Sequence, residues 1–171
     1  MDDRSITLLL RLIHILAGIF WVGAAFLMAG FLVPTMRETG REGGRFIQHL
    51  MQKRRLPIFI GVAMLLTIIS GLTMYARVTA ATHGSWAGTP PGIAYGVGGL
   101  AAILGAITGS LLSGAAGRRM AVVGQSIGPQ GPTSEQQAEM GRLQSRMSLG
   151  TRLAAALLLL AAGAMAVARY L

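Results

Sequence analysis

Four long apolar segments constrain the fold of this 171-residue chain more than any other feature. They cover residues 6–33, 57–76, 93–116 and 153–168. Each is near or above the length of about 20 apolar residues that a helix needs to cross a bilayer. Charged residues make up only 12% of the chain, roughly half the fraction of a typical soluble domain. We therefore expect four membrane spans at these positions.

The apolar segments predict helices, because they are continuously apolar instead of alternating as the strands of a membrane barrel do. Four spanning helices use most of the chain, so no separate soluble domain is expected. The predicted fold is all-α, an integral membrane four-helix bundle that forms a single domain over residues 1–171. The lipid bilayer is thus its first expected partner.

The basic residues are distributed unevenly, and their distribution predicts the orientation of the bundle. Eleven of the fifteen flank one side of the predicted spans. They are Arg37, Arg41, Arg45, Lys53, Arg54, Arg55, Arg118, Arg119, Arg142, Arg146 and Arg152. Because cytoplasmic loops are enriched in lysine and arginine, this side is expected in the cytoplasm and both termini outside. The net charge of +9 is therefore a topology signal that also suits anionic lipids, and nucleic acid is not expected as a partner.

Two cytoplasmic features are expected between the spans. Residues 38–44 are polar and turn-rich, and residues 45–55 follow as a short amphipathic helix that should lie at the headgroup level. Between the third and fourth spans the chain breaks at residues 128–132, after which Thr133 or Ser134 can cap a new helix. That helix can run unbroken into the fourth span, giving a cytoplasmic helical extension.

Small residues recur every four positions in the third span, at Ala101, Gly105, Gly109, Ser113 and Gly117. Such a ridge allows another helix to approach closely in a membrane. The fourth span offers counterparts at Ala154, Ala155, Ala161, Ala162 and Gly163. We expect the ridge to pack within the bundle, with a homo-oligomer interface as the alternative.

A histidine inside the first span is the strongest functional signal. Arg11, His14, Gly18 and Trp21 fall near one helical face at spacings of three, four and three residues. His14 lies roughly 12 Å below the outer end of the span, at 1.5 Å per residue. Ionisable groups at such a depth usually face the protein interior and often mark a site. A neutral imidazole there can ligate haem iron or copper, or it can hydrogen-bond a helix carbonyl or a hydroxyl.

The rest of a cofactor site is less well defined. No second histidine lies in a span, so Met74 and Met165, at a similar depth, are the candidate second ligands for haem iron or copper. Arg11 can pair with a haem propionate or extend to the headgroups. The chain has no cysteine, so any haem would be held non-covalently as haem b. No carboxylate lies in a span, which argues against a proton-coupled pump.

Residues 11–34, with His14, then Trp21-Val22-Gly23 and finally Pro34, resemble the opening helix of the CopD-like membrane proteins. The HemJ-type protoporphyrinogen oxidases are related four-helix proteins with a histidine at this point. Residues 165–170 also resemble the end of small members of this group. The resemblance implies a haem b or copper function with His14 as the ligand, in a bacterial cytoplasmic (inner) membrane. HemJ-type proteins carry a lysine in a later helix, whereas the one lysine here, Lys53, lies in a loop.

These observations leave three hypotheses for function. The first is a haem b protein for electron transfer or oxidoreduction in the membrane, with His14 as axial ligand and a separate redox partner. The second is a non-catalytic accessory subunit of a larger respiratory or photosynthetic membrane complex. The third is copper handling or transport through His14 with Met74 or Met165. Whether the protein is an enzyme does not follow from the sequence.

Overall fold

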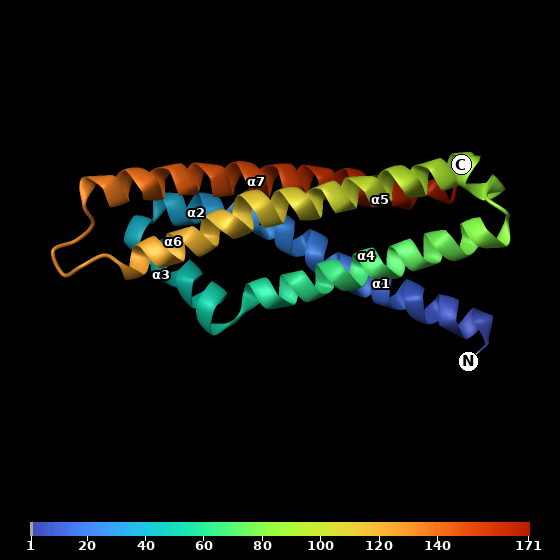
Figure 1. Cartoon of the computed structure of the whole chain (residues 1–171), viewed down its shortest axis with the longest axis horizontal. Helices are drawn as coiled ribbons and strands as arrows, with labels where there is room; N and C mark the ends of the chain where they lie inside the picture. Colours follow the sequence, from blue (N-terminus) through green and yellow to red (C-terminus); the bar gives the residue numbers. More distant parts are fainter. Residues whose placement is uncertain (1) are drawn as a thin grey trace.

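The computed structural model describes residues 2–171 and contains four helical rods long and apolar enough to cross a membrane (Figure 1). The rods are Asp3–Glu38, Leu56–Ala81, Pro90–Gln125 and Ser134–Ala168. This confirms the expected all-α architecture and indicates a multi-pass membrane protein. Both termini lie at one end of the bundle. That this end faces outside remains a prediction from the basic residues.

The first rod extends beyond its predicted span, which ends at residue 33. Helix α1 (Asp3–Leu27) continues through the π-helical turn η1 (Met28–Leu32) into α2 (Val33–Glu38). Proline has no backbone N–H to donate and would normally break a helix interior. The π-turn shifts the hydrogen-bond pattern just before it, so that the Val33 N–H donates to the Met28 carbonyl. The rod therefore passes through the proline and extends beyond residue 33.

The third rod is likewise longer than its predicted span. Helix α5 (Pro90–Thr108) continues through the π-helical segment η4 (Gly109–Gly114) into α6 (Ala115–Gln125). The fourth rod, α7 (Ser134–Ala168), begins with the predicted cap at Thr133, whose side chain forms a capping box with Gln136. Arg119 of α6 pairs with Glu139 of α7 at 2.7 Å. The α6–α7 hairpin is the expected helical extension.

The amphipathic segment begins earlier than predicted. Helix α3 (Gly40–Gln48), continued by η2 (His49–Lys53), includes the residues that were expected to form a turn. Helices α2 and α3 meet so closely that a Cβ on Gly43 would lie 2.9 Å from the Met36 Cα. This close approach explains why position 43 is a glycine. Ile47 then packs against a small core that includes Val33 and Met36.

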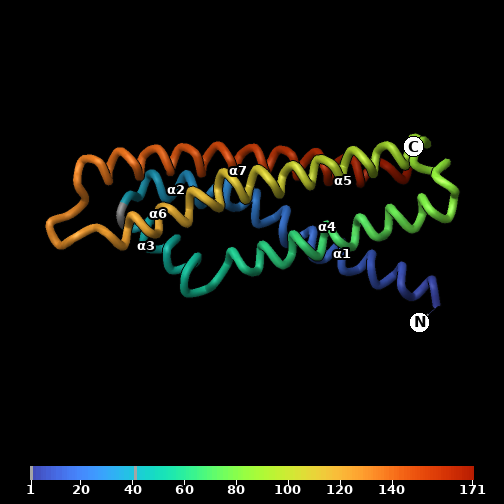
Figure 2. Tube along the Cα trace, viewed as in Figure 1, coloured from blue at the N-terminus to red at the C-terminus, as the bar shows by residue number. Residues whose placement is uncertain are grey.

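The rods form two closely packed pairs, α5 with α7 and α1 with α4 (Figures 1 and 2). At the end that holds the termini, the first turns of α1 diverge from the α5–α7 pair. In α5–α7 the predicted ridge packs inside the bundle: Gly105 lies against Leu158 and Gly109 against Ala154. Of the predicted counterparts on α7, Ala154, Ala155 and Ala161 are buried, whereas Ala162 and Gly163 are exposed.

The close contact between η4 and α7 at Gly150 predicts the cost of adding one methyl group. A Cβ at Gly150 would lie 2.4 Å from the Leu112 Cβ and 3.0 Å from the Ser113 backbone nitrogen. Gly150→Ala should therefore force the helices apart and lower the free energy of unfolding by about 1–3 kcal/mol, measured by thermal unfolding in detergent. Gly163→Ala on the same helix meets nothing within 4 Å and should be neutral or stabilising. Equal effects of the two variants would contradict this packing.

The predicted orientation can be tested because the chain has no cysteine of its own. Ser85 lies between α4 and α5, and Gln130 between α6 and α7, at opposite ends of the bundle. A membrane-impermeant maleimide should label Ser85→Cys in cells whose outer membrane is permeabilised, and should label Gln130→Cys only after lysis. The reverse pattern would place the termini in the cytoplasm.

Candidate functional site

His14 lies between helices α1 and α4 (Leu56–Ala81) and is bound to the α4 backbone. Its Nδ1 atom lies 2.8 Å from the carbonyl oxygen of Thr67. The Ser70 hydroxyl oxygen lies 3.4 Å from the same nitrogen. The imidazole is half-buried, while Thr67 and Ser70 are buried. The histidine therefore joins the two helices through a polar cluster.

The hydrogen bond to Thr67 determines the tautomer of the ring. A carbonyl oxygen only accepts, so Nδ1 carries the proton and donates. The Nε2 atom of the neutral ring then carries the lone pair. Nε2 makes no hydrogen bond with any residue that the structure describes. Metal-ligating histidines are commonly held in this way, with one ring N–H donated to a backbone carbonyl.

The ring reaches the α4 backbone because of Gly71. A Cβ at this position would lie 2.7 Å from the His14 Cε1 atom and 3.0 Å from its Nδ1. Any side chain here would displace the imidazole. Gly18, which the sequence places on the histidine face, lies instead against the side chain of Thr67, with a would-be Cβ 3.6 Å from its Cγ2.

The other residues predicted for the site lie in different surroundings. Arg11 is exposed and forms no ion pair with the described residues. Trp21 is only 5% exposed and packs in the main core with Ala63, Ala101 and Leu158. The structure therefore leaves the Arg11 side chain exposed and uses Trp21 for packing between the two helix pairs.

The two candidate methionines differ in their environment. Met165 lies in the α5–α7 interface, where its Cγ atom would be 2.9 Å from a Cβ at Gly98. Met74 is half-buried on α4, one turn beyond Ser70 and Gly71. Met74 therefore lies on α4, the helix to which His14 is hydrogen-bonded, whereas Met165 packs between α5 and α7. His49 and His83 are both exposed, and no three metal-ligating His, Cys, Asp or Glu side chains gather within the described chain.

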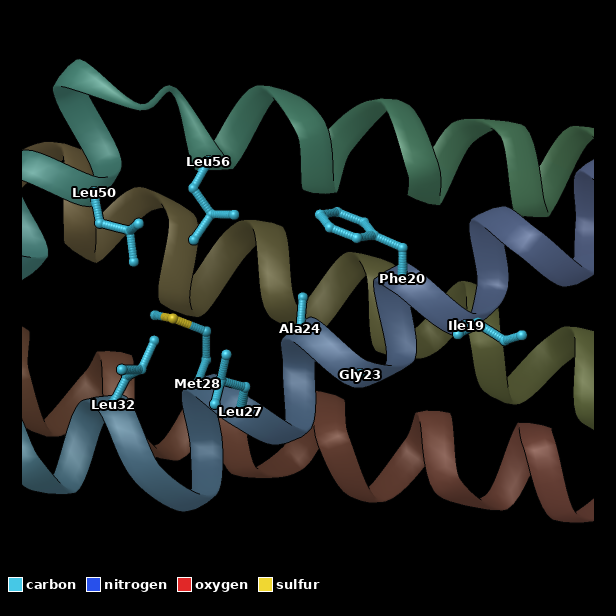
Figure 3. Close-up of a pocket in the computed structure, with 9 residues that line it drawn as sticks. All are labelled: Ile19, Phe20, Gly23, Ala24, Leu27, Met28, Leu32, Leu50 and Leu56. Atoms are coloured by element: carbon cyan, nitrogen blue, oxygen red, sulfur yellow. The ribbon is translucent and has the colours of Figure 1, made fainter.

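A cavity lies toward the basic end of α1, and His14 is not one of the residues that line it (Figure 3). It is an apolar groove of about 400 Å³ between α1–η1 on one side and η2 and the start of α4 on the other. Phe20, Leu50 and Leu56 point into it. Its lining offers no ligand for a metal other than the thioether of Met28.

Three aromatic residues form a cluster where α4 leads through η3 into α5. The Trp86 ring lies 5.2 Å from the Tyr75 ring and 6.0 Å from the Tyr95 ring. The Tyr75 hydroxyl donates to the Gly92 carbonyl at 3.3 Å. The cluster connects α4 to α5 above the level of His14.

Sequence reasoning identified His14 but missed its three neighbours Thr67, Ser70 and Gly71. Their spacing of three and four residues gives them one face of the second span. A face with two hydroxyl residues and a glycine is unusual in an apolar helix, and this pattern could have identified the neighbours of His14. What the sequence could not give is the register between the first two helices, on which the contact depends.

Comparison of the chain with protein-family models, curated proteins and solved structures found no match in any of the three.

The position of Gly71 predicts how the imidazole responds to a single methyl group. Gly71→Ala should displace His14 from Thr67 and lower the free energy of unfolding by about 1–3 kcal/mol, through a lost hydrogen bond and crowding. Gly61→Ala on the same helix meets nothing within 4 Å and serves as the matched control. Thermal unfolding in detergent measures both. A stable Gly71→Ala protein would contradict the close contact.

Proposed function

We propose that this protein binds haem b through His14 and takes part in electron transfer or oxidoreduction in a bacterial inner membrane. The observation that carries the proposal is the 2.8 Å contact between the His14 Nδ1 and the Thr67 carbonyl. This contact orients the ring and places the lone pair of the neutral tautomer on Nε2. An oriented imidazole of this kind is suited to bind iron.

His14 supplies one axial ligand, and its neighbours hold the ring in position. Thr67 orients the ring, Ser70 adds a polar neighbour, and Gly71 leaves room for the imidazole. Arg11, about one turn toward the outer surface, carries a free positive charge that can compensate a propionate. Bound haem b would supply one-electron transfer, and the chain would set its potential through the axial ligand and the surrounding polarity.

Met74 is the favoured second ligand within the chain. It lies on α4, to which the His14 ring is hydrogen-bonded, whereas Met165 packs against Gly98. A second copy of the chain, contributing its own His14, is the other source of a sixth ligand. The resemblance of residues 11–34 to the CopD-like proteins supports the choice of haem or copper at this position.

Copper handling is the alternative that uses the same residues, because imidazole and thioether both suit copper(I). An accessory subunit of a larger complex is favoured by a different observation: the first turns of α1 diverge from α5 and α7 and leave a long apolar face without a protein partner in the described chain. In that case His14 would serve only to join α1 to α4.

The absorption spectrum of the purified protein separates these functions. We expect a Soret band in protein expressed with sufficient haem, and we expect His14→Ala to lose it. His49→Ala and His83→Ala replace exposed histidines and should retain the band. Met74→Leu should keep bound haem but change the spectrum of the reduced form, which distinguishes a ligand from a packing residue.

Other outcomes contradict the proposal. Stoichiometric copper without a Soret band, lost in His14→Ala, would assign the site to copper. A protein without either cofactor that purifies with other membrane subunits would be an accessory subunit. A Soret band that persists in a folded His14→Ala protein would place the haem elsewhere.

A further inference from the structure

A second cavity, of about 210 Å³, opens between α2 and α7 at the basic end of the bundle. Its walls are Val33, Pro34, Arg37, Glu38, Ser148 and Arg152. It shares no residue with the His14 cluster or with the apolar groove. Two arginines therefore border a small cavity that the proposed haem function does not use.

Ser148 contributes an uncharged hydroxyl group to the wall of this cavity. It is only 6% exposed, yet its hydroxyl makes no hydrogen bond with any other residue that the structure describes. The hydroxyl oxygen itself stays accessible from the cavity, so it is free to hydrogen-bond a group held there. Since Ser148 also lines the cavity, a ligand there is the natural partner for the hydroxyl.

The charges around Ser148 favour an anion. Arg37 and Arg152 form no ion pair with the described residues, Glu38 included. The Arg37 guanidinium donates to the Gln144 carbonyl at 3.0 Å, which holds it across the gap from α2 to α7. Two arginines and one glutamate leave a net charge of +1, which matches a monoanionic phosphodiester. Guanidinium groups bind phosphate oxygens with particularly favourable geometry.

The depth of the cavity along the bundle indicates that the phosphate belongs to a lipid headgroup. Val33 is the last residue of the first predicted span and Arg152 immediately precedes the fourth. The cavity therefore lies where two apolar spans meet the basic side, at headgroup level. Basic pockets between membrane helices on the cytoplasmic side bind anionic headgroups, and Val33 and Pro34 offer an apolar wall for the adjoining glycerol and acyl groups.

We propose that this cavity binds the phosphodiester headgroup of an anionic phospholipid of the phosphatidylglycerol type, with Arg152 and Ser148 as its principal contacts. The lipid would join α2 to α7 beside the hydrogen bond from Arg37 to the Gln144 carbonyl. The proposal is independent of whether His14 binds haem.

Native mass spectrometry of the full-length purified protein, titrated with phosphatidylglycerol and with phosphatidylcholine, tests the site. The protein should bind phosphatidylglycerol more tightly. Arg152→Gln should weaken this binding about fivefold, the effect of one basic residue near an anionic headgroup, and Ser148→Ala should weaken it severalfold. Glu38→Gln removes a repulsive charge and should strengthen binding by a similar factor, a gain that misfolding cannot produce.

The control is Arg142→Gln, which removes an exposed arginine of α7 outside the cavity and should leave the affinity unchanged. Equal losses in Arg142→Gln and Arg152→Gln would overturn the proposal in favour of nonspecific surface attraction. Unchanged affinity in Glu38→Gln would also overturn it. Displacement of the lipid by an equal concentration of inorganic phosphate would show that a free anion is the ligand.

Discussion

The structure depends on close backbone contact between helices that the hydrophobic effect does not drive together. In a bilayer the lipid is as apolar as the helix surface, so association relies on packing and on interhelical hydrogen bonds. Each helix pair meets this requirement at glycines. Gly105, Gly109 and Gly150 allow α5 and α7 to approach, and Gly71 allows His14 to reach α4.

Polar groups then add specificity to the glycine contacts. In α5–α7 the Ser113 hydroxyl bonds the Met147 carbonyl at 3.1 Å and lies 3.0 Å from the Thr151 hydroxyl. Between α1 and α4 the corresponding hydrogen bond joins the His14 imidazole to the Thr67 carbonyl. Serine and threonine would suffice to join two helices, as the first pair shows. A histidine in the second pair brings something that they lack, a ring nitrogen able to bind a metal, and this difference supports a function beyond packing.

Much of the fold followed from the sequence, because helix position in a membrane is set by local apolar length. The four rods, the Thr133 cap and the packing of the Gly105 and Gly109 ridge were all predicted. The end of the first rod at residue 33 and the start of the amphipathic helix were predicted wrongly, since both depend on compensating contacts: a π-turn before Pro34, and the approach of α3 to Met36 at Gly43. His14 was found as an ionisable group in an apolar span. Its partners Thr67 and Gly71 could not be assigned, because they depend on the register between two helices.

The central claim is that the neutral His14 ring carries its proton on Nδ1 and its lone pair on Nε2. Solid-state ¹⁵N NMR of histidine-labelled protein in lipid bilayers measures this directly, since the chain has only three histidines. The account predicts one histidine, absent from His14→Gln, with a protonated Nδ1 and an unprotonated Nε2 in the cofactor-free protein. A neutral His14 with its proton on Nε2 and its lone pair on Nδ1 would contradict it.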